Sequence, residues 1–298
     1  MSEGRIGVIG LGKMGLPIAG HLTASGQATA GYDPSPDARA AAKAKNVDIV
    51  SDLGELVRGS ACSLVVVGND EQLLDVCLSP GGVLDSAERG HAVFICSTVS
   101  PETSIRIGER GAAVGVHVLD ATLSRGEFGA IDGNLLMMAA GPEDVLQRWV
   151  ETFRCFAPDI VHLGRLGAGQ VGKLTNNLLV WVNLVGNYEA LRLGMRFGVD
   201  QEKLRQALLL SGGDNPMMRT WRRPRPMPWA EDDMAIVMER ADALRLPMPM
   251  AGLVRELVKE IKNRKREWGT DPESYENMFD FVEWLESATA SATEGTIA

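Results

Sequence analysis

Gly10-Leu11-Gly12-Lys13-Met14-Gly15 is the stretch that decides the fold of this chain. It follows an apolar run of strand character, Arg5–Ile9, and opens a run of helical character, Met14–Ala24. The first glycine permits a tight turn, the second lets the backbone approach a pyrophosphate, and the third lets helix and strand pack closely. The free N–H groups at the start of such a helix favour phosphate. The sequence therefore predicts a dinucleotide-binding turn made of all six residues.

A carboxylate follows the next apolar run. Ala28–Tyr32 leads into Asp33, which lies 18 positions after Gly15. An aspartate at this place can accept both hydroxyls of the adenosine ribose and would repel a 2′-phosphate, which predicts NAD in preference to NADP. Arg39 nearby is the argument for NADP. The alternative is a plain glycine turn followed by a surface aspartate.

The chain up to residue 164 alternates short apolar runs with helical segments. Several of the runs lack polar alternation, as strands covered on both faces do. This order predicts a doubly wound, mostly parallel Rossmann sheet of α/β class over residues 1–164. The strand runs after the first two are Leu64–Val67, Val93–Cys96, Val118–Ala121, Leu135–Ala140 and Ile160–Leu163, and the helical segments include Asp37–Ala44 and Pro101–Ala113.

The remaining residues, 165–298, predict an all-helical second domain. A stretch without proline runs from Gly167 to Phe197. As one helix it would be about 45 Å long and would join the two domains. Further helices are expected at Gln201–Leu210, Asp232–Ala243 and Met250–Lys262.

Composition excludes several classes of function. The 298 residues carry a formal net charge of -9, so no broad cationic field is available for nucleic acid. No apolar run approaches the roughly 18 residues of a membrane helix. The four cysteines form no CxxC pair and the four histidines are scattered, which predicts no metal site. With no recognisable leader at its start, the protein is expected in the cytoplasm.

Two later segments suggest chemistry. In Asp120–Gly126, the Ser124 hydroxyl and nearby backbone amides at the end of a strand can hold a carboxylate, although an ordinary β-turn explains the segment equally well. In Gly167–Asn177, Lys173 and Asn177 share one helix face. Apolar neighbours favour the neutral form of a lysine, which suits proton transfer. The alternative is a surface lysine that extends its amine into water.

Together these features resemble the β-hydroxyacid dehydrogenase family. Its members include 3-hydroxyisobutyrate dehydrogenase, tartronate semialdehyde reductase and related glyoxylate or succinic semialdehyde reductases. The likeness runs from about residue 5 to about residue 200. It rests on the glycine turn, Asp33, Ser97-Thr98, the Ser124 segment, and a G-x-G-x-x-x-K-x-x-x-N pattern met by Gly167, Gly169, Lys173 and Asn177.

The resemblance implies a role for each site residue. It implies hydride transfer between NAD and a small 3-hydroxy acid, or the matching semialdehyde or oxo acid, with the nicotinamide facing Lys173 between the domains. Lys173 and Asn177 would be catalytic, and the helical domain would form a homodimer or homotetramer. The substrate residues would be Ser124, Arg125, Gly126, Asn176 and Asp232, and the cofactor residues would be Gly10, Leu11, Gly12, Lys13, Met14, Gly15, Asp33, Asn69 and Thr98.

The chain departs from the family pattern in two places. The usual turn, D-A-P-V-S-G-G, here has Thr122 for proline and Arg125 for the first glycine. We expect Arg125 to clamp an acidic substrate or to narrow the pocket. The usual K-D-L segment has its nearest match at Asp232-Asp233-Met234. Asp232 in place of the lysine would favour a cationic group on the substrate, unless it is only a helix N-cap.

Three other interpretations stay open. An imine reductase shares the fold but generally replaces the lysine, and a phosphogluconate dehydrogenase fits the serine segment poorly. A non-catalytic NAD-binding scaffold would not need Ser124, Lys173 and Asn177 together. Arginines at 219, 222, 223 and 225 predict a solvated loop or, alternatively, an anion-binding lid.

Overall fold

The computed structural model describes residues 4–225, 227–269 and 276–294. Its contacts divide the chain into two compact units, Met1–Lys173 and Leu174–Ala298. The sequence-based boundary, between residues 164 and 165, falls shortly before this division. The first unit extends further because the first turns of the long helix pack on its sheet.

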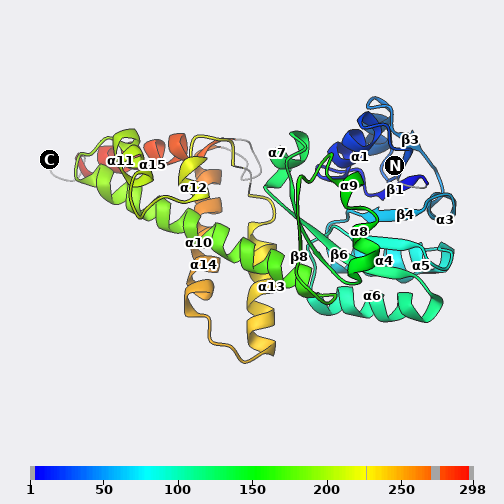
Figure 1. Ribbon diagram of the computed structural model, residues 1–298. Helices are drawn as coiled ribbons and strands as arrows, with labels where there is room; N and C mark the ends of the chain where they lie inside the picture. Colours follow the sequence, from blue (N-terminus) through cyan, green and yellow to red (C-terminus); the bar gives the residue numbers. More distant parts are fainter. Residues whose placement is uncertain (1–3, 226, 270–275, 295–298) are drawn as a thin grey trace. The chain divides into compact units, whose positions relative to one another are not determined.

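The first unit is built on an eight-stranded sheet (Figure 1). Its order is β3-β2-β1-β4-β5-β6-β7-β8, and all neighbours are parallel except the antiparallel pair β6 and β7. The chain reverses its winding direction at β1, which confirms the doubly wound Rossmann sheet. The strands are β1 (Ile6–Ile9), β2 (Thr29–Tyr32), β3 (Asp48–Ile49), β4 (Cys62–Val65), β5 (Ala92–Ile95), β6 (His117–Ser124), β7 (Leu136–Ala140) and β8 (Asp159–His162).

Helices cover both faces of this sheet. Several begin with a serine, aspartate or asparagine whose side chain accepts a hydrogen bond from the backbone of the first turn, the usual device for starting a helix. They are α1 (Gly15–Ala24), α2 (Pro36–Lys43), α3 (Leu53–Arg58), α4 (Asp70–Leu78), α5 (Val83–Ser86), α6 (Pro101–Val114), α7 (Gly126–Ile131), α8 (Glu143–Gln147) and α9 (Val150–Phe153).

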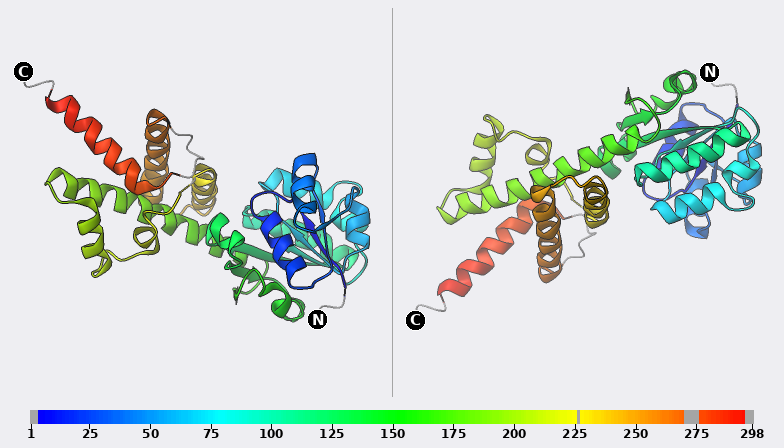
Figure 2. Two further views of the ribbon diagram at one scale, coloured as in Figure 1. Left: turned by 90° about the horizontal axis from the view of Figure 1, so that it is seen from above. Right: turned by 90° about the horizontal axis from the view of Figure 1, so that it is seen from below.

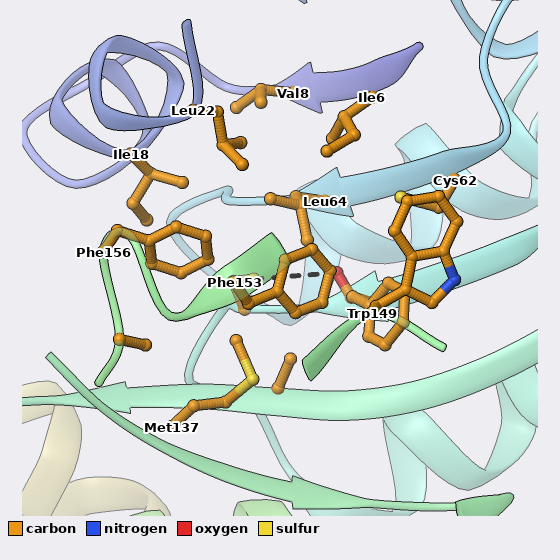
Figure 3. Close-up of a cluster of buried hydrophobic side chains, with 14 of the residues drawn as sticks. Ile6, Val8, Ile18, Leu22, Cys62, Leu64, Met137, Trp149, Phe153 and Phe156 are labelled. Carbon is orange, nitrogen blue, oxygen red and sulfur yellow. Dashed lines mark hydrogen bonds between the residues drawn. The ribbon is translucent and has the colours of Figure 1, made fainter. Parts of the chain in front are cut away.

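Alternate strand residues supply two separate apolar cores. Val8 and Leu64 belong to the cluster under α1 and α9, whereas Ile9 and Val65 belong to the cluster under α3 to α6. Figure 3 shows the first cluster, with Phe153 near its centre. The centroid of the Phe153 ring lies 4.9 Å from that of Phe94, in an edge-on arrangement. Because successive strand side chains point to opposite faces, continuous apolar runs are what a sheet covered on both faces requires.

The strands end differently from the sequence-based ranges, and one difference matters for the site. β4 and β5 stop at Val65 and Ile95, two residues and one residue earlier than expected. β6 continues to Ser124 because it pairs with β7, with Ser124 opposite Leu136. Ser124 is therefore the last residue of a strand, and the turn begins only at Arg125. The elements β3, α3, α4, α5 and α7 to α9 had no sequence prediction.

The second unit is helical among the residues that the structure describes, apart from one isolated bridge between Pro224 and Asn277. The long helix is unbroken, and its course can be followed in green in both views of Figure 2. Its apolar side chains pack with those of the later helices in one cluster. The final helix and the short helix at Pro216–Arg219 were not predicted. The elements are α10 (Ala168–Arg196), α11 (Gln201–Leu209), α12 (Pro216–Arg219), α13 (Ala230–Ala243), α14 (Pro249–Glu267) and α15 (Met278–Glu294).

Candidate active site

The predicted cofactor residues meet at one edge of the sheet. Ile9 lies opposite both Tyr32 and Val65, Val65 lies opposite Ile95, and Ile95 lies opposite Asp120. The segments that leave these parallel strands at their carboxyl ends therefore emerge side by side. In open α/β sheets, this edge next to the winding reversal is where nucleotides bind.

The glycine turn fits a dinucleotide. Gly10 has a left-handed φ of 93°, and a Cβ on it would overlap the backbone carbonyl of Val66. A Cβ on Gly15 would overlap the carbonyl of Gly10, so the fold itself requires both glycines. A Cβ on Gly12 would meet nothing within 4 Å. The middle glycine is therefore not explained by packing, and the open space beside it suits a close-approaching pyrophosphate.

Asp33 is fixed beside this turn. Its Oδ2 accepts a hydrogen bond of 2.8 Å from the amide of Leu11, and its Oδ1 accepts one of 2.8 Å from the amide of Ser35. Arg39 donates from Nη1 to the carbonyl oxygens of Asp33, at 2.7 Å, and Pro34, at 2.9 Å. The carboxylate is thus oriented by the glycine turn, and the neighbouring guanidinium is directed to backbone carbonyl groups.

Asn69 and Thr98 lie in the two loops that follow β4 and β5. The Asn69 side chain caps α4 by accepting a 2.9 Å hydrogen bond from the amide of Gln72, and Thr98 is half-buried. Asp70 joins the loops by accepting a 3.0 Å hydrogen bond from the amide of Ser100. Ser97 also joins them, because its hydroxyl accepts a 2.8 Å hydrogen bond from the amide of Val67. The sequence carried no signal for the linking role of Asp70.

The predicted carboxylate-binding residues lie where β6 ends and α7 begins. Ser124 is buried, and Arg125 and Gly126 both have left-handed φ values, 82° and 66°. The Arg125 guanidinium binds the Asn134 side chain at 2.9 Å and the Asp159 carboxylate at 2.5 Å. The Arg125 guanidinium was expected to clamp an acidic substrate. It instead binds a carboxylate of this chain, that of Asp159 at the start of β8. The serine hydroxyl and the amides at the start of α7 remain the groups suited to a carboxylate.

The start of α10 is attached to β6 by a buried carboxylate. Asp120 Oδ2 accepts hydrogen bonds from the amides of Gly167, at 2.7 Å, and Gly169, at 3.1 Å. Burial raises the pKa of the Asp120 carboxyl, although these hydrogen bonds oppose the rise. A carboxylate at the N-terminus of a helix also meets the positive end of the helix dipole. Asp120 therefore holds the long helix at the carboxyl edge of the sheet.

The remaining residues of the glycine-rich segment serve close packing. A Cβ on Gly169 would lie 2.5 Å from the Asp120 Cβ, and one on Gly172 would overlap the Leu163 side chain. The fully buried Gln170 donates to the carbonyl of Ser97 at 3.0 Å and accepts from the amide of Val99 at 3.1 Å. Sequence reasoning missed Gln170, although its place inside the family pattern offered a signal.

Lys173 follows Gly169 by one helical turn on the same face of α10. Lys173 is half-buried, and Asn177, one turn further, is buried and accepts a 3.2 Å hydrogen bond from the Asn176 side chain. Ser124 lies four positions after Asp120 in β6, so both side chains point to the side of the strand on which α10 begins. Ser124 therefore points to the side of the sheet on which α10 begins, and Lys173 lies one helical turn after Gly169 in that helix.

Two family models match most of the chain. Residues 5–164 match the NAD binding domain of 6-phosphogluconate dehydrogenase, and residues 167–273 match the NAD-binding domain of NADP-dependent 3-hydroxyisobutyrate dehydrogenase. The chain belongs to the β-hydroxyacid dehydrogenase family. The expectation drawn from the glycine turn, Asp33 and Lys173 is thereby confirmed at the level of the family.

Individual family members show the same relationship. Mitochondrial 3-hydroxyisobutyrate dehydrogenase of Mus musculus is 30% identical over 212 residues, which are 71% of this chain and 63% of the mouse enzyme. The Pseudomonas aeruginosa 3-hydroxyisobutyrate dehydrogenase is 28% identical over 85% of this chain and 90% of its own length. The structure of the Mycobacterium tuberculosis enzyme with L-serine has the same fold, with a TM-score of 0.79 at 22% identity, covering 95% of this chain and 99% of that one.

Asp232-Asp233-Met234, the nearest match to the family's K-D-L segment, contains two aspartates with different surroundings. Asp232 is exposed in the first turn of α13. The interpretation of Asp232 as an N-cap is wrong, because Trp229 holds that position. Asp233 is buried and accepts a 3.1 Å hydrogen bond from the Trp181 indole. The substrate-binding role of Asp232 stays a prediction.

Three arginines of the segment 219–225 bind other side chains of this chain. Arg219 pairs with Asp214, and Arg222 pairs with Glu202 at 2.9 Å while its guanidinium lies over the Phe279 ring. Arg225 donates to the Thr220 hydroxyl at 2.6 Å. These contacts favour a loop over the anion-binding lid, although the loop is bound to other groups of this chain rather than fully solvated.

Two other properties concern the described part of the chain. Residues 4–225, 227–269 and 276–294 contain no group of three or more histidine, cysteine or acidic side chains that could hold a metal ion. Among the same residues, no helix combines the length and apolarity that a membrane span needs. The four cysteines are free thiols, and burial raises the pKa of Cys77 and of Cys96 to about 12.

Proposed function

We propose that this family member transfers a hydride between NAD and a small 3-hydroxy acid, or its semialdehyde or oxo-acid partner, with Lys173 as general acid/base. The observation that carries the proposal is the attachment of α10 to β6. It fixes Gly169, which precedes Lys173 by one helical turn, on the side of the sheet to which Ser124 points. A proton-transfer group and a carboxylate-binding group are what the oxidation of a hydroxy acid needs near the hydride acceptor.

Each residue has a distinct task in this scheme. Ser124 and the amides that begin α7 hold the substrate carboxylate, with Asn176 assigned to the same substrate. The Lys173 amine takes the hydroxyl proton during oxidation and returns a proton to the carbonyl oxygen during reduction. Asn177 orients that oxygen. The hydride chemistry is supplied by the nicotinamide when NAD is bound.

NAD is the proposed cofactor in preference to NADP. The Asp33 carboxylate is held by two backbone amides and would meet a 2′-phosphate with like charge. Arg39 is directed to backbone carbonyl groups, which supports the same preference. The family model that matches residues 167–273 is named for an NADP-dependent enzyme, so the assay should compare NAD with NADP.

The proposed substrates are 3-hydroxy acids of about four carbons and serine-like compounds. Support comes from the relatives named 3-hydroxyisobutyrate dehydrogenase and from the related enzyme whose structure includes L-serine. Asp232 is a candidate partner for a substrate amine. The cytoplasmic location and the homodimer or homotetramer stay predictions.

The decisive experiment compares Lys173→Ala with Lys45→Ala, which removes an exposed lysine of the same unit. The assay follows NADH production from 3-hydroxyisobutyrate, L-serine and further 2- and 3-hydroxy acids. We expect Lys173→Ala to lose at least ~100-fold in kcat, the scale of general acid–base catalysis. NADH binding should persist in both variants, and Lys45→Ala should match the wild type.

Full turnover by Lys173→Ala would refute the role of this amine. NADH binding by the wild type without turnover of any hydroxy or oxo acid would instead indicate a scaffold. Faster reduction of C=N than of C=O substrates would indicate an imine reductase.

A further inference from the structure

Thr122 is a residue of β6, and its side chain is buried against β7 and the start of α10. It is fully buried, although its side chain is polar. Its hydroxyl lies 3.1 Å from the carbonyl oxygen of Met138, the residue opposite it in the sheet, and 3.0 Å from the carbonyl oxygen of Gly169. Thr122 stands between Asp120 and Ser124 on the same face of the strand. It therefore connects the sheet with the first turn of α10.

The carbonyl of Gly169 has a second partner of interest. In an α-helix, the carbonyl oxygen of residue i accepts the amide of residue i+4, so this oxygen also receives the backbone N–H of Lys173. A hydroxyl that donates to this carbonyl acts on the same hydrogen-bonded turn that carries the lysine. A proline, which stands here in the usual family turn, has no group that could do so.

We propose that Thr122 is a positioning residue, which fixes the first turn of α10 on the β6–β7 pair and so sets where the Lys173 amine stands. The inference rests on the proposed function for its effect on turnover. Its effect on the surroundings of Lys173 can be measured without turnover. Valine has the shape of threonine without the hydroxyl, and loss of that donor leaves buried carbonyl groups with fewer partners.

The first measurement uses turnover of 3-hydroxyisobutyrate or L-serine with NAD. We expect Thr122→Val to lower kcat about 10-fold, because small displacements of a reacting group slow chemistry strongly. The Kd for NADH should change by no more than about two-fold, since the cofactor turn is untouched. Thr122→Ser restores the hydroxyl and should regain most of kcat. In the Lys173→Ala background, Thr122→Val should cause no further loss.

The second measurement follows acylation of Lys173 by acetic anhydride, read by mass spectrometry from about pH 7 to about pH 10, where lysine amines titrate. Relative to Lys45, the Lys173 rate should change about three-fold or more in Thr122→Val and remain unchanged in Thr122→Ser. If the valine variant does not fold, Thr122→Cys, which keeps a weak donor, should give a smaller change in the same direction.

The outcomes separate the two proposals. Unchanged kcat and unchanged Lys173 acylation in Thr122→Val, with only a lower Tm, would overturn the positioning role. A changed acylation rate together with full activity of Lys173→Ala would keep the positioning role and refute the proposed function.

Discussion

Gly169 lies so close to Asp120 that a Cβ on the glycine would stand 2.5 Å from the Cβ of the aspartate and 2.8 Å from the carbonyl oxygen of Met138. The same aspartate accepts the amide of Gly169 at 3.1 Å. Close approach and hydrogen bonding thus depend on each other. The helix can be capped by Asp120 only because residue 169 has no side chain.

We therefore expect Gly169→Ala to destabilise the first unit by about 1–3 kcal/mol, the usual cost of an overpacked site. The alanine Cβ would meet the backbone carbonyl oxygen of Met138, which cannot turn aside as a flexible side chain can. The helix must therefore move. That displacement should also lower kcat through Lys173. Urea unfolding followed by circular dichroism, together with steady-state kinetics, would measure both effects.

Gly186 offers a matched control in the same helix. A Cβ there would meet nothing within 4 Å. Alanine forms helix more readily than glycine, so Gly186→Ala should gain about 0.5–1 kcal/mol. Equal stability of the two alanine variants would contradict the packing described for Gly169.

Asp33 should control the choice between NAD and NADP. We expect Asp33→Asn to lower kcat/KM for NAD by about 10- to 100-fold, because a hydrogen bond to a charged group contributes roughly 1.5–3 kcal/mol. The relative use of NADP should rise, since the like charge is gone. Asp37→Asn removes an exposed carboxylate nearby and should leave the ratio unchanged. An unaltered ratio in Asp33→Asn would remove the assigned role.

His91 should make the stability of the fold depend on pH. It is buried, its Nε2 lies 2.9 Å from the Ser63 hydroxyl, and burial lowers its pKa from 6.5 to about 4. Between these values the unfolded chain binds a proton that the folded chain does not. The free energy of unfolding therefore falls as pH drops from about 6.5 to about 4, by up to about 3 kcal/mol.

Urea unfolding of the wild type and of His91→Gln between about pH 7 and about pH 4 would measure this contribution. The difference between the two chains should shrink as pH falls, because only the wild type loses the contribution of the neutral imidazole. Parallel pH curves for the two proteins would contradict it.

Local patterns were enough for the sheet and the nucleotide turn. The glycine turn after Arg5–Ile9 and the carboxylate at Asp33 were found where the structure has them, because turn, helix start and strand end each depend on neighbouring residues. The helices α3, α4, α5 and α7 to α9 were not found, since they gain their stability from packing on the sheet. The extension of β6 to Ser124 depends on β7, whose pairing no local pattern reveals.

What the sequence determined by itself is the alternation of the main strands and helices, the glycine turn and the residue types available for chemistry, since periodicity and backbone freedom are local properties. Tertiary structure decided the partners: Arg125 with Asp159, Asp233 with Trp181, and Asp120 and Thr122 with the start of α10. These pairs join residues far apart in the chain, and only the folded strands and helices bring their polar atoms within hydrogen-bond distance.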